Sequence, residues 1–111
     1  MWERTRHGAV DIVIGSQPVD RDTVGPLRRI MEECVGSGQP RLVFDAAEVP
    51  LFDSAGIELL LDIREACLQR GGEFQLAALN PLCLDILNAT GVAELFDIFD
   101  DSVVAAGSFA Q

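Results

Sequence analysis

The amino-acid sequence predicts an α/β domain with a mixed sheet of four or five strands and about four helices packed mainly on one face. Short apolar runs rich in β-branched residues are typical of strands, and the segments between them repeat apolar residues at helical spacings of three and four. Gly, Pro and Asp residues separate the two kinds of segment. The resulting succession of strand and helix indicates parallel strands joined by helical crossovers, in one domain over residues 1–111.

The chain begins with a predicted β-hairpin. Val10–Ile14 is a run of β-branched residues interrupted only by an Asp, and Trp2–Arg6 can pair with it through a turn at His7 and Gly8. Because two strands joined by a tight turn run antiparallel, this hairpin makes the predicted sheet mixed.

The first helix is predicted over Val24–Val35. Four of its apolar residues fall on one face: Leu27, Ile30, Met31 and Cys34. Thr23 or Asp22 can cap its start, and the glycines of the segment 36–38 can end it.

The rest of the chain continues the alternation. The further predicted strands are Arg41–Asp45, Glu73–Ala78 and Phe96–Phe99. The further predicted helices are Ser54–Arg70, Pro81–Ala89 and Asp101–Ala110. Gly71 and Gly72 end the first of these helices, and Gly91 lies beyond the second.

The charge balance excludes several classes of partner. Lys and Arg number 8 and Asp and Glu 18, which gives a net charge of −10, and the pI is about 4.2. Nucleic acids and anionic membrane surfaces need a basic patch, so we expect neither as a partner. The longest apolar runs, Leu76–Leu79 and Val103–Ala106, are far shorter than the roughly 18 residues of a membrane span, so we expect no membrane insertion.

The three cysteines indicate a reducing compartment. Cys34, Cys67 and Cys83 are far apart in the sequence, show no metal-ligand spacing, and each lies in an apolar helical pattern. We therefore expect buried, reduced thiols in a cytoplasmic protein without a metal or cofactor. The N-terminal residues also lack the apolar stretch of a signal peptide.

The sequence offers little for catalysis. An enzymatic nucleophile needs a base nearby, and the single histidine, His7, falls in the predicted hairpin turn. The chain contains neither a nucleophile-elbow motif nor a glycine-rich phosphate loop. We therefore expect a protein that is not an enzyme and has no catalytic residues.

The predicted helix Ser54–Arg70 is apolar except for a narrow polar stripe. This stripe consists of Glu58, Asp62, Glu65 and Gln69. Spacings of four, three and four place its carboxylates in line on one face. The stripe is either an ordinary solvated face or an acidic surface that a partner contacts.

An Asp-Ser-x-Gly segment stands between the strand Arg41–Asp45 and this helix. It places the hydroxyl of Ser54 at a helix N-terminus, where unpaired backbone amides and the positive end of the helix dipole tolerate an anion. A phosphate on Ser54 would therefore not melt the helix. In the simpler alternative, Asp53 or Ser54 serves only as an N-cap.

The segment Phe52–Ile57, placed after a hydrophobic strand, resembles the phospho-acceptor motif of anti-sigma factor antagonists in the STAS domain family. Other segments match this family in the same order: Gly15 with Val19–Val24, Gly71–Phe74, and Leu87–Val92 with Leu95, Phe96 and Ile98. The resemblance extends over residues 10–110. The loop Ser16–Pro18 is two residues longer than the family pattern and lies on the face with which the family binds its partners.

The resemblance implies a protein switch. Such proteins, when unphosphorylated, bind a serine-kinase-type anti-sigma factor and free the sigma factor that it holds. The kinase then phosphorylates the motif serine, here Ser54, with ATP, and a separate phosphatase removes the phosphate. The partner-binding residues implied here are Asp20, Thr23, Asp53, Ser54, Ala55, Gly56 and Glu58. Within this set Asp53 would orient the acceptor hydroxyl or contact the partner, and Asp20 and Thr23 would shape the neighbouring surface.

A second reading of the resemblance stays open. STAS domains also act as interaction modules in other assemblies, such as signalling scaffolds or accessory subunits of lipid transporters. The hydroxyl of Ser54 favours the switch, because a module that is not phosphorylated does not need it. The longer Ser16–Pro18 loop leaves the identity of the partner open.

Overall fold

The computed structural model describes residues 1–36 and 38–109, and its five strands lie in the order β1-β2-β3-β4-β5. The strands are β1 (Trp2–His7), β2 (Val10–Gly15), β3 (Arg41–Asp45), β4 (Glu73–Ala77) and β5 (Ile98–Phe99). The helices are α1 (Val24–Val35), α2 (Ser54–Gln69), α3 (Pro81–Ala89), the 3₁₀ helix η1 (Val92–Leu95) and α4 (Ser102–Ser108). The predicted α/β fold with a mixed sheet is confirmed.

The hairpin β1–β2 supplies the antiparallel part of the sheet, and β2 to β5 are parallel. His7 pairs with Val10, so the two turn residues are Gly8 and Ala9. The turn predicted at His7 and Gly8 is therefore shifted by one residue. Gly8 has φ +63°, in the left-handed region that glycine enters without strain.

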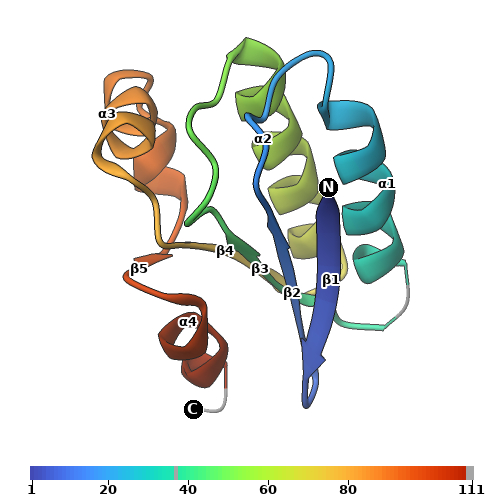
Figure 1. Cartoon of the computed structure of the whole chain (residues 1–111). Helices are drawn as coiled ribbons and strands as arrows, with labels where there is room; N and C mark the ends of the chain where they lie inside the picture. Colours follow the sequence, from blue (N-terminus) through green and yellow to red (C-terminus); the bar gives the residue numbers. More distant parts are fainter. Residues whose placement is uncertain (37, 110–111) are drawn as a thin grey trace.

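Helices α1, α2 and α3 cover one face of the sheet, where they enclose the main core; Figure 1 shows α1 and α2 side by side. The sheet contributes Trp2, Val13, Leu42, Phe44, Phe74 and Leu76 to this core. The helices contribute Leu27, Met31, Cys34, Val35, Leu59, Leu60, Ile63, Cys67, Cys83 and Leu87. Alternate strand residues point to opposite faces, so each buried strand serves two cores.

The opposite face of the sheet is covered by α4, which Figure 1 shows well away from α1 and α2. Ala105 of α4 packs there against Val10, Ile12, Val43 and Ala77. The helices therefore lie mainly, but not all, on one face, as the sequence predicts.

The C-terminal third differs most from its prediction. The strand predicted over Phe96–Phe99 is only two residues long, because the ring of Phe96 packs edge-on against Phe74, with centroids 5.6 Å apart, inside the main core. The 3₁₀ helix η1 that precedes it has no counterpart in the predicted elements. The strand β4 ends at Ala77, one residue early, because Ala78 has φ +59°.

Two predicted helices also have shifted ends. Helix α2 ends at Gln69, and Arg70 is its C-cap rather than its last residue. Helix α4 spans Ser102–Ser108, because Asp101 is its N-cap. The predicted end of this helix at Ala110 lies outside the described residues.

The three cysteines are buried and unpaired, as predicted. Burial raises the pKa of Cys34 and of Cys67 to about 11, and it also raises the pKa of Cys83. These thiols are therefore protonated and protected near neutral pH.

Across residues 1–36 and 38–109, no helix combines the length and apolar character that crossing a bilayer requires.

Candidate functional site

Ser54 is the first residue of α2, and its side chain is exposed. It follows the loop that leaves the carboxyl end of β3. The ring of Phe52, in this loop, packs against Phe44 of β3, and Phe44 packs against Trp2 of β1. The ring centroids are 6.3 Å apart in the first pair and 6.0 Å apart in the second. The predicted place of Ser54, in the first turn of the second long helix, is confirmed.

Asp53 is the N-cap of α2, and its carboxylate links two segments. One oxygen, Oδ1, accepts a hydrogen bond from the amide of Gly56 at 2.9 Å. The other, Oδ2, accepts from the amide of Arg21 at 3.1 Å, in the loop before α1. These bonds, the one from Gly56 first, hold the pKa of the Asp53 carboxyl below its ordinary value.

The loop before α1 is also held through its backbone. Val19 donates to the carbonyl of Leu51 at 2.9 Å, and Asp53 donates to the carbonyl of Val19 at 3.1 Å. This carbonyl lies so close to Gly56 that an added Cβ would overlap it. Gly56 is buried for this reason, and it lies beneath the surface near Ser54 rather than on it.

Asp20 and Thr23 shape the same loop from within. The Thr23 hydroxyl donates to the carbonyl of Pro18 at 2.7 Å and accepts from the amide of Asp20 at 3.0 Å. The Asp20 carboxylate in turn accepts from the amides of Asp22 and Thr23. Thr23, one of the two predicted capping residues, is the N-cap residue of α1, but its side chain makes no cap bond.

These contacts form a shallow hollow of about 420 Å³ beside the acceptor serine. It is lined by Asp20, Arg21, Asp22, Asp53, Ser54 and Ala55. The sequence reasoning missed Arg21, although a lone basic residue between two aspartates in a matched family segment was a usable signal. Among the described residues that line this hollow, Arg21 is the only cation.

The acidic stripe of α2 starts one turn beyond Ser54. Glu58 is exposed and shares a helix face with Ser54. Asp62, one turn further, forms an ion pair with Arg28 of α1 at 3.1 Å. The stripe is therefore part of the junction between α1 and α2 at Asp62, and it is free surface at Glu58.

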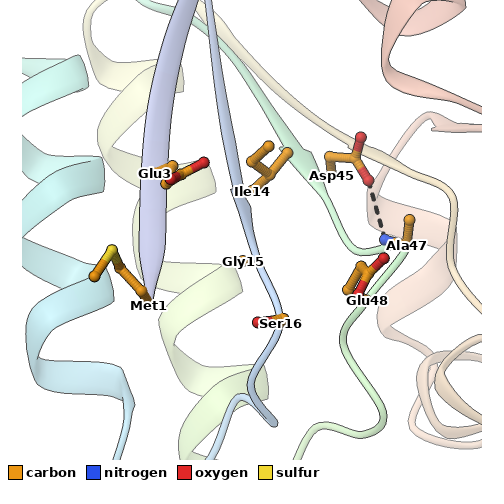
Figure 2. Close-up of a pocket in the computed structure, with 8 residues that line it drawn as sticks. All are labelled: Met1, Glu3, Ile14, Gly15, Ser16, Asp45, Ala47 and Glu48. Carbon is orange, nitrogen blue, oxygen red and sulfur yellow. Dashed lines mark hydrogen bonds between the residues drawn. The ribbon is translucent and has the colours of Figure 1, made fainter.

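A second hollow, of about 460 Å³, lies near the carboxyl ends of β2 and β3 (Figure 2). Figure 2 shows Glu3 and Ile14 on one side of it and Asp45, Ala47 and Glu48 on the other, with the Asp45 carboxylate accepting from the amide of Ala47 at 3.0 Å. Ser16, from the longer loop, lies on its border.

His7 is remote from both hollows. It pairs with Val10 at the beginning of β2, whereas Ser54 follows the carboxyl end of the parallel neighbour β3. A histidine at the far end of the sheet cannot activate the Ser54 hydroxyl. Within residues 1–36 and 38–109, no cluster of His, Cys, Asp and Glu side chains has the geometry to hold a metal ion.

Comparisons with known proteins agree with this architecture. A curated relative, the anti-sigma F factor antagonist of Paenibacillus polymyxa, is 28% identical over 104 residues, 93% of this chain and 89% of that protein. The structure of an anti-sigma-factor antagonist (STAS) domain protein from Planctomyces limnophilus has a TM-score of 0.91 and 22% identity, with 99% of this chain and 98% of that chain covered. The Bacillus cell fate determinant SpoIIAA in its phosphorylated form has a TM-score of 0.76 and 13% identity, with 98% and 99% covered.

The two similar structures, at 22% and 13% identity, show that the fold is shared. The assignment to a family comes from a sequence model, that of the STAS domain, which matches residues 2–105. This match includes all five strands, the loop before α1 and the start of α2 with Ser54. The chain therefore belongs to the STAS domain family.

Proposed function

We propose that this protein is an anti-sigma factor antagonist whose binding to a serine-kinase-type anti-sigma factor is controlled by phosphorylation of Ser54. It acts in the cytoplasm as a binding protein, not as an enzyme, and a phosphatase restores the unphosphorylated form. The observation that supports this most directly is the exposed Ser54 at the start of a helix that the loop before α1 holds in place. The curated relative, named an anti-sigma F factor antagonist, supports the partner class.

The Ser54 hydroxyl is available as a phosphoryl acceptor. Within the described part of the chain it makes no hydrogen bond, whereas both carboxylate oxygens of Asp53 are engaged by backbone amides. Because its pKa is held low, the Asp53 carboxylate is a weak base. In the transfer, the bond from Ser54 Oγ to the γ-phosphorus of ATP forms, the bond to the ADP oxygen breaks, and a base of the kinase takes the hydroxyl proton.

Phosphorylation changes the charge at the centre of the proposed binding surface. A phosphoserine adds about −1.5 to −2 charges at neutral pH. The hollow beside Ser54 already contains the carboxylates of Asp20, Asp22 and Asp53. Covering this added charge with a partner that offers no cation would cost several kcal/mol, which is a loss of affinity of two orders of magnitude or more.

The test combines modification and binding. The full chain is incubated with candidate cognate kinases and ATP, and the Ser54 peptide is examined by mass spectrometry. In calorimetric titrations, Ser54→Ala is expected to bind the kinase-type anti-sigma factor both with and without ATP, because it cannot accept a phosphate. Ser54→Asp, with one added charge, is expected to bind about 10- to 100-fold more weakly.

Ser102 provides a matched control. It is the first residue of α4, it follows the capping residue Asp101, and it lies on the opposite face of the sheet. Ser102→Asp is therefore expected to bind like the unaltered protein, and the Ser102 peptide is expected to remain unmodified. If Ser54→Asp binds as tightly as Ser54→Ala while both are folded, Ser54 is not the switch, and the interaction-module function takes its place.

A further inference from the structure

Arg21 stands in an unusual electrostatic position. The hollow beside Ser54 contains three carboxylates, those of Asp20, Asp22 and Asp53, and among its described lining residues the Arg21 guanidinium is the single positive charge. In a chain of net charge −10, a lone arginine in such a place is conspicuous. Among the residues that the structure describes, it forms no ion pair of the kind that holds Arg28 to Asp62.

The backbone fixes where Arg21 stands relative to Ser54. Its amide donates to the carboxylate of Asp53, the residue immediately before the acceptor serine. The neighbouring pairing of Val19 with Leu51 and Asp53 holds the same loop against the start of α2. The Arg21 side chain is exposed and so is free to turn toward Ser54.

The charge of Arg21 also reaches this helix start. After the hydrogen bonds from backbone amides, the Arg21 guanidinium is among the groups that lower the pKa of the Asp53 carboxyl. A group attached to the next residue, and carrying nearly twice the charge of a carboxylate, would attract the same guanidinium more strongly.

We propose that Arg21 is the intramolecular partner of phosphorylated Ser54: the phosphate enters the hollow and pairs with the guanidinium. The planar fork of arginine matches two phosphate oxygens at once, and such charge-assisted pairs are the strong ones. This inference rests on the proposed function, because it concerns the phosphorylated state. It adds that phosphorylation also withdraws the one cation that the hollow offers to a partner.

The test uses protein with phosphoserine placed at position 54 during synthesis, so that no kinase is needed. The second pKa of the phosphate, near 6 in unperturbed phosphoserine, is measured by ³¹P NMR titration at low ionic strength. A neighbouring guanidinium favours the doubly charged phosphate, so Arg21→Gln is expected to raise this pKa by about half a pH unit. Arg21→Lys, which keeps the charge but loses the fork, is expected to fall between the two.

Arg70→Gln is the matched control, because Arg70 is exposed at the opposite end of the same helix. It removes the same charge and is expected to leave the phosphate titration unchanged. Equal titrations in the unaltered protein and Arg21→Gln would overturn the pairing, as would an equal shift in Arg70→Gln. Should Arg21→Gln melt below the titration temperature, Arg21→Ala, which also removes the charge, takes its place, and a titration equal to that of the unaltered protein overturns the pairing.

The two proposals can fail separately. Since the phosphate is installed without a kinase, absence of the pairing leaves the binding experiment with Ser54→Ala and Ser54→Asp unaffected. Conversely, a Ser54 that no kinase modifies would overturn the proposed switch, while the ³¹P titration would still report whether the hollow can hold a phosphate.

Discussion

Helices α2 and α3 begin in closely similar ways. Each has an N-cap side chain that accepts from the amide three residues later: Asp53 from Gly56 at 2.9 Å, and Asn80 from Cys83 at 2.8 Å. In each, a valine carbonyl from an earlier loop lies against that third residue. The carbonyl of Val19 lies over Gly56, and that of Val49 lies 3.5 Å from the Cys83 sulfur.

The two helix starts differ in the second polar group of the capping side chain. The second oxygen of Asp53 can only accept, and it takes the Arg21 amide. The second group of Asn80 can only donate, and it binds the carbonyl of Val49 at 2.9 Å. The start of α2 is therefore held by a charge and the start of α3 by a neutral group. The residue after the cap differs as well, because α2 exposes Ser54 where α3 has Pro81.

The largest effect is expected from Gly56→Ala. The new methyl group would overlap the Val19 carbonyl, so either the loop or the helix start must move. We expect a loss of about 3 kcal/mol in the free energy of unfolding, measured by denaturant titration. Unlike Gly56, Cys83 at the equivalent position of α3 has a side chain, and its sulfur lies 3.5 Å from the Val49 carbonyl, so the loop backbone leaves room there for a Cβ.

Gly25→Ala serves as the control for this change. Gly25 lies in the first turn of α1, is exposed, and has open space where a Cβ would stand. Alanine is expected to stay within about 0.5 kcal/mol of the unaltered protein, because helix propensity favours it while the following Pro26 restricts its backbone. Equal losses from the two substitutions would contradict the close approach at Gly56.

Asn80→Ala tests the neutral start. It removes a cap of about 1 kcal/mol and a hydrogen bond to the Val49 carbonyl of about 1 kcal/mol, so we expect a loss of about 2 kcal/mol. Asn88→Ala, at an exposed position of the same helix, is expected to stay within about 0.5 kcal/mol of the unaltered protein. If both substitutions are neutral, Asn80 does not hold α3 in place.

Asp53→Asn tests the charged start through pH. The pKa of Asp53 is lowered in the folded state, so the carboxylate stabilises the fold above its ordinary pKa of 3.8 and loses this effect as the pH falls through the folded value. The stability difference between the unaltered protein and Asp53→Asn is therefore expected to be constant from pH 7 to about 5 and to shrink below pH 4. The stability difference caused by Asn80→Ala is expected not to shrink below about pH 4, because Asn80 carries no charge. A stability difference for Asp53→Asn that does not change with pH would show that the charge of Asp53 does not stabilise the start of α2.

The smallest effect is expected from thiol labelling of the unaltered protein. Burial and raised pKa values protect Cys34, Cys67 and Cys83, so a bulky thiol reagent is expected to react about as slowly as the protein unfolds. In Asn80→Ala, Cys83 is expected to react about tenfold faster than Cys67, because only the start of α3 is loosened. Equal acceleration at both cysteines would indicate global rather than local opening.

Much of this site could be predicted from local sequence. The order of strands and helices follows from apolar periodicity and glycine positions, which concern residues a few positions apart. The placement of Ser54 at a helix start follows from Asp-Ser-x-Gly after an apolar strand. Burial of the cysteines follows from their apolar helical surroundings.

Local sequence alone left the roles of neighbouring residues undecided. Both Asp53 and Ser54 favour the N-cap position, and the structure selects Asp53 because its second oxygen finds the Arg21 amide. At α1, Thr23 occupies the N-cap position, but its hydroxyl binds the backbone of Pro18 and Asp20 and makes no bond to the helix. Phe96 left the predicted strand because its ring gains more from the core beside Phe74.

The sequence by itself determined the fold class, the order of the strands and long helices along the chain, and the serine at the start of α2. The tertiary structure alone decided that Arg21 stands beside Ser54, that Val19 demands a glycine at position 56, and that α4 covers the second face. The physical reason is separation along the chain. Caps and periodic patterns depend on residues within one or two turns, whereas Arg21 and Asp53 meet across 32 positions, only after the sheet has brought their loops to the same edge.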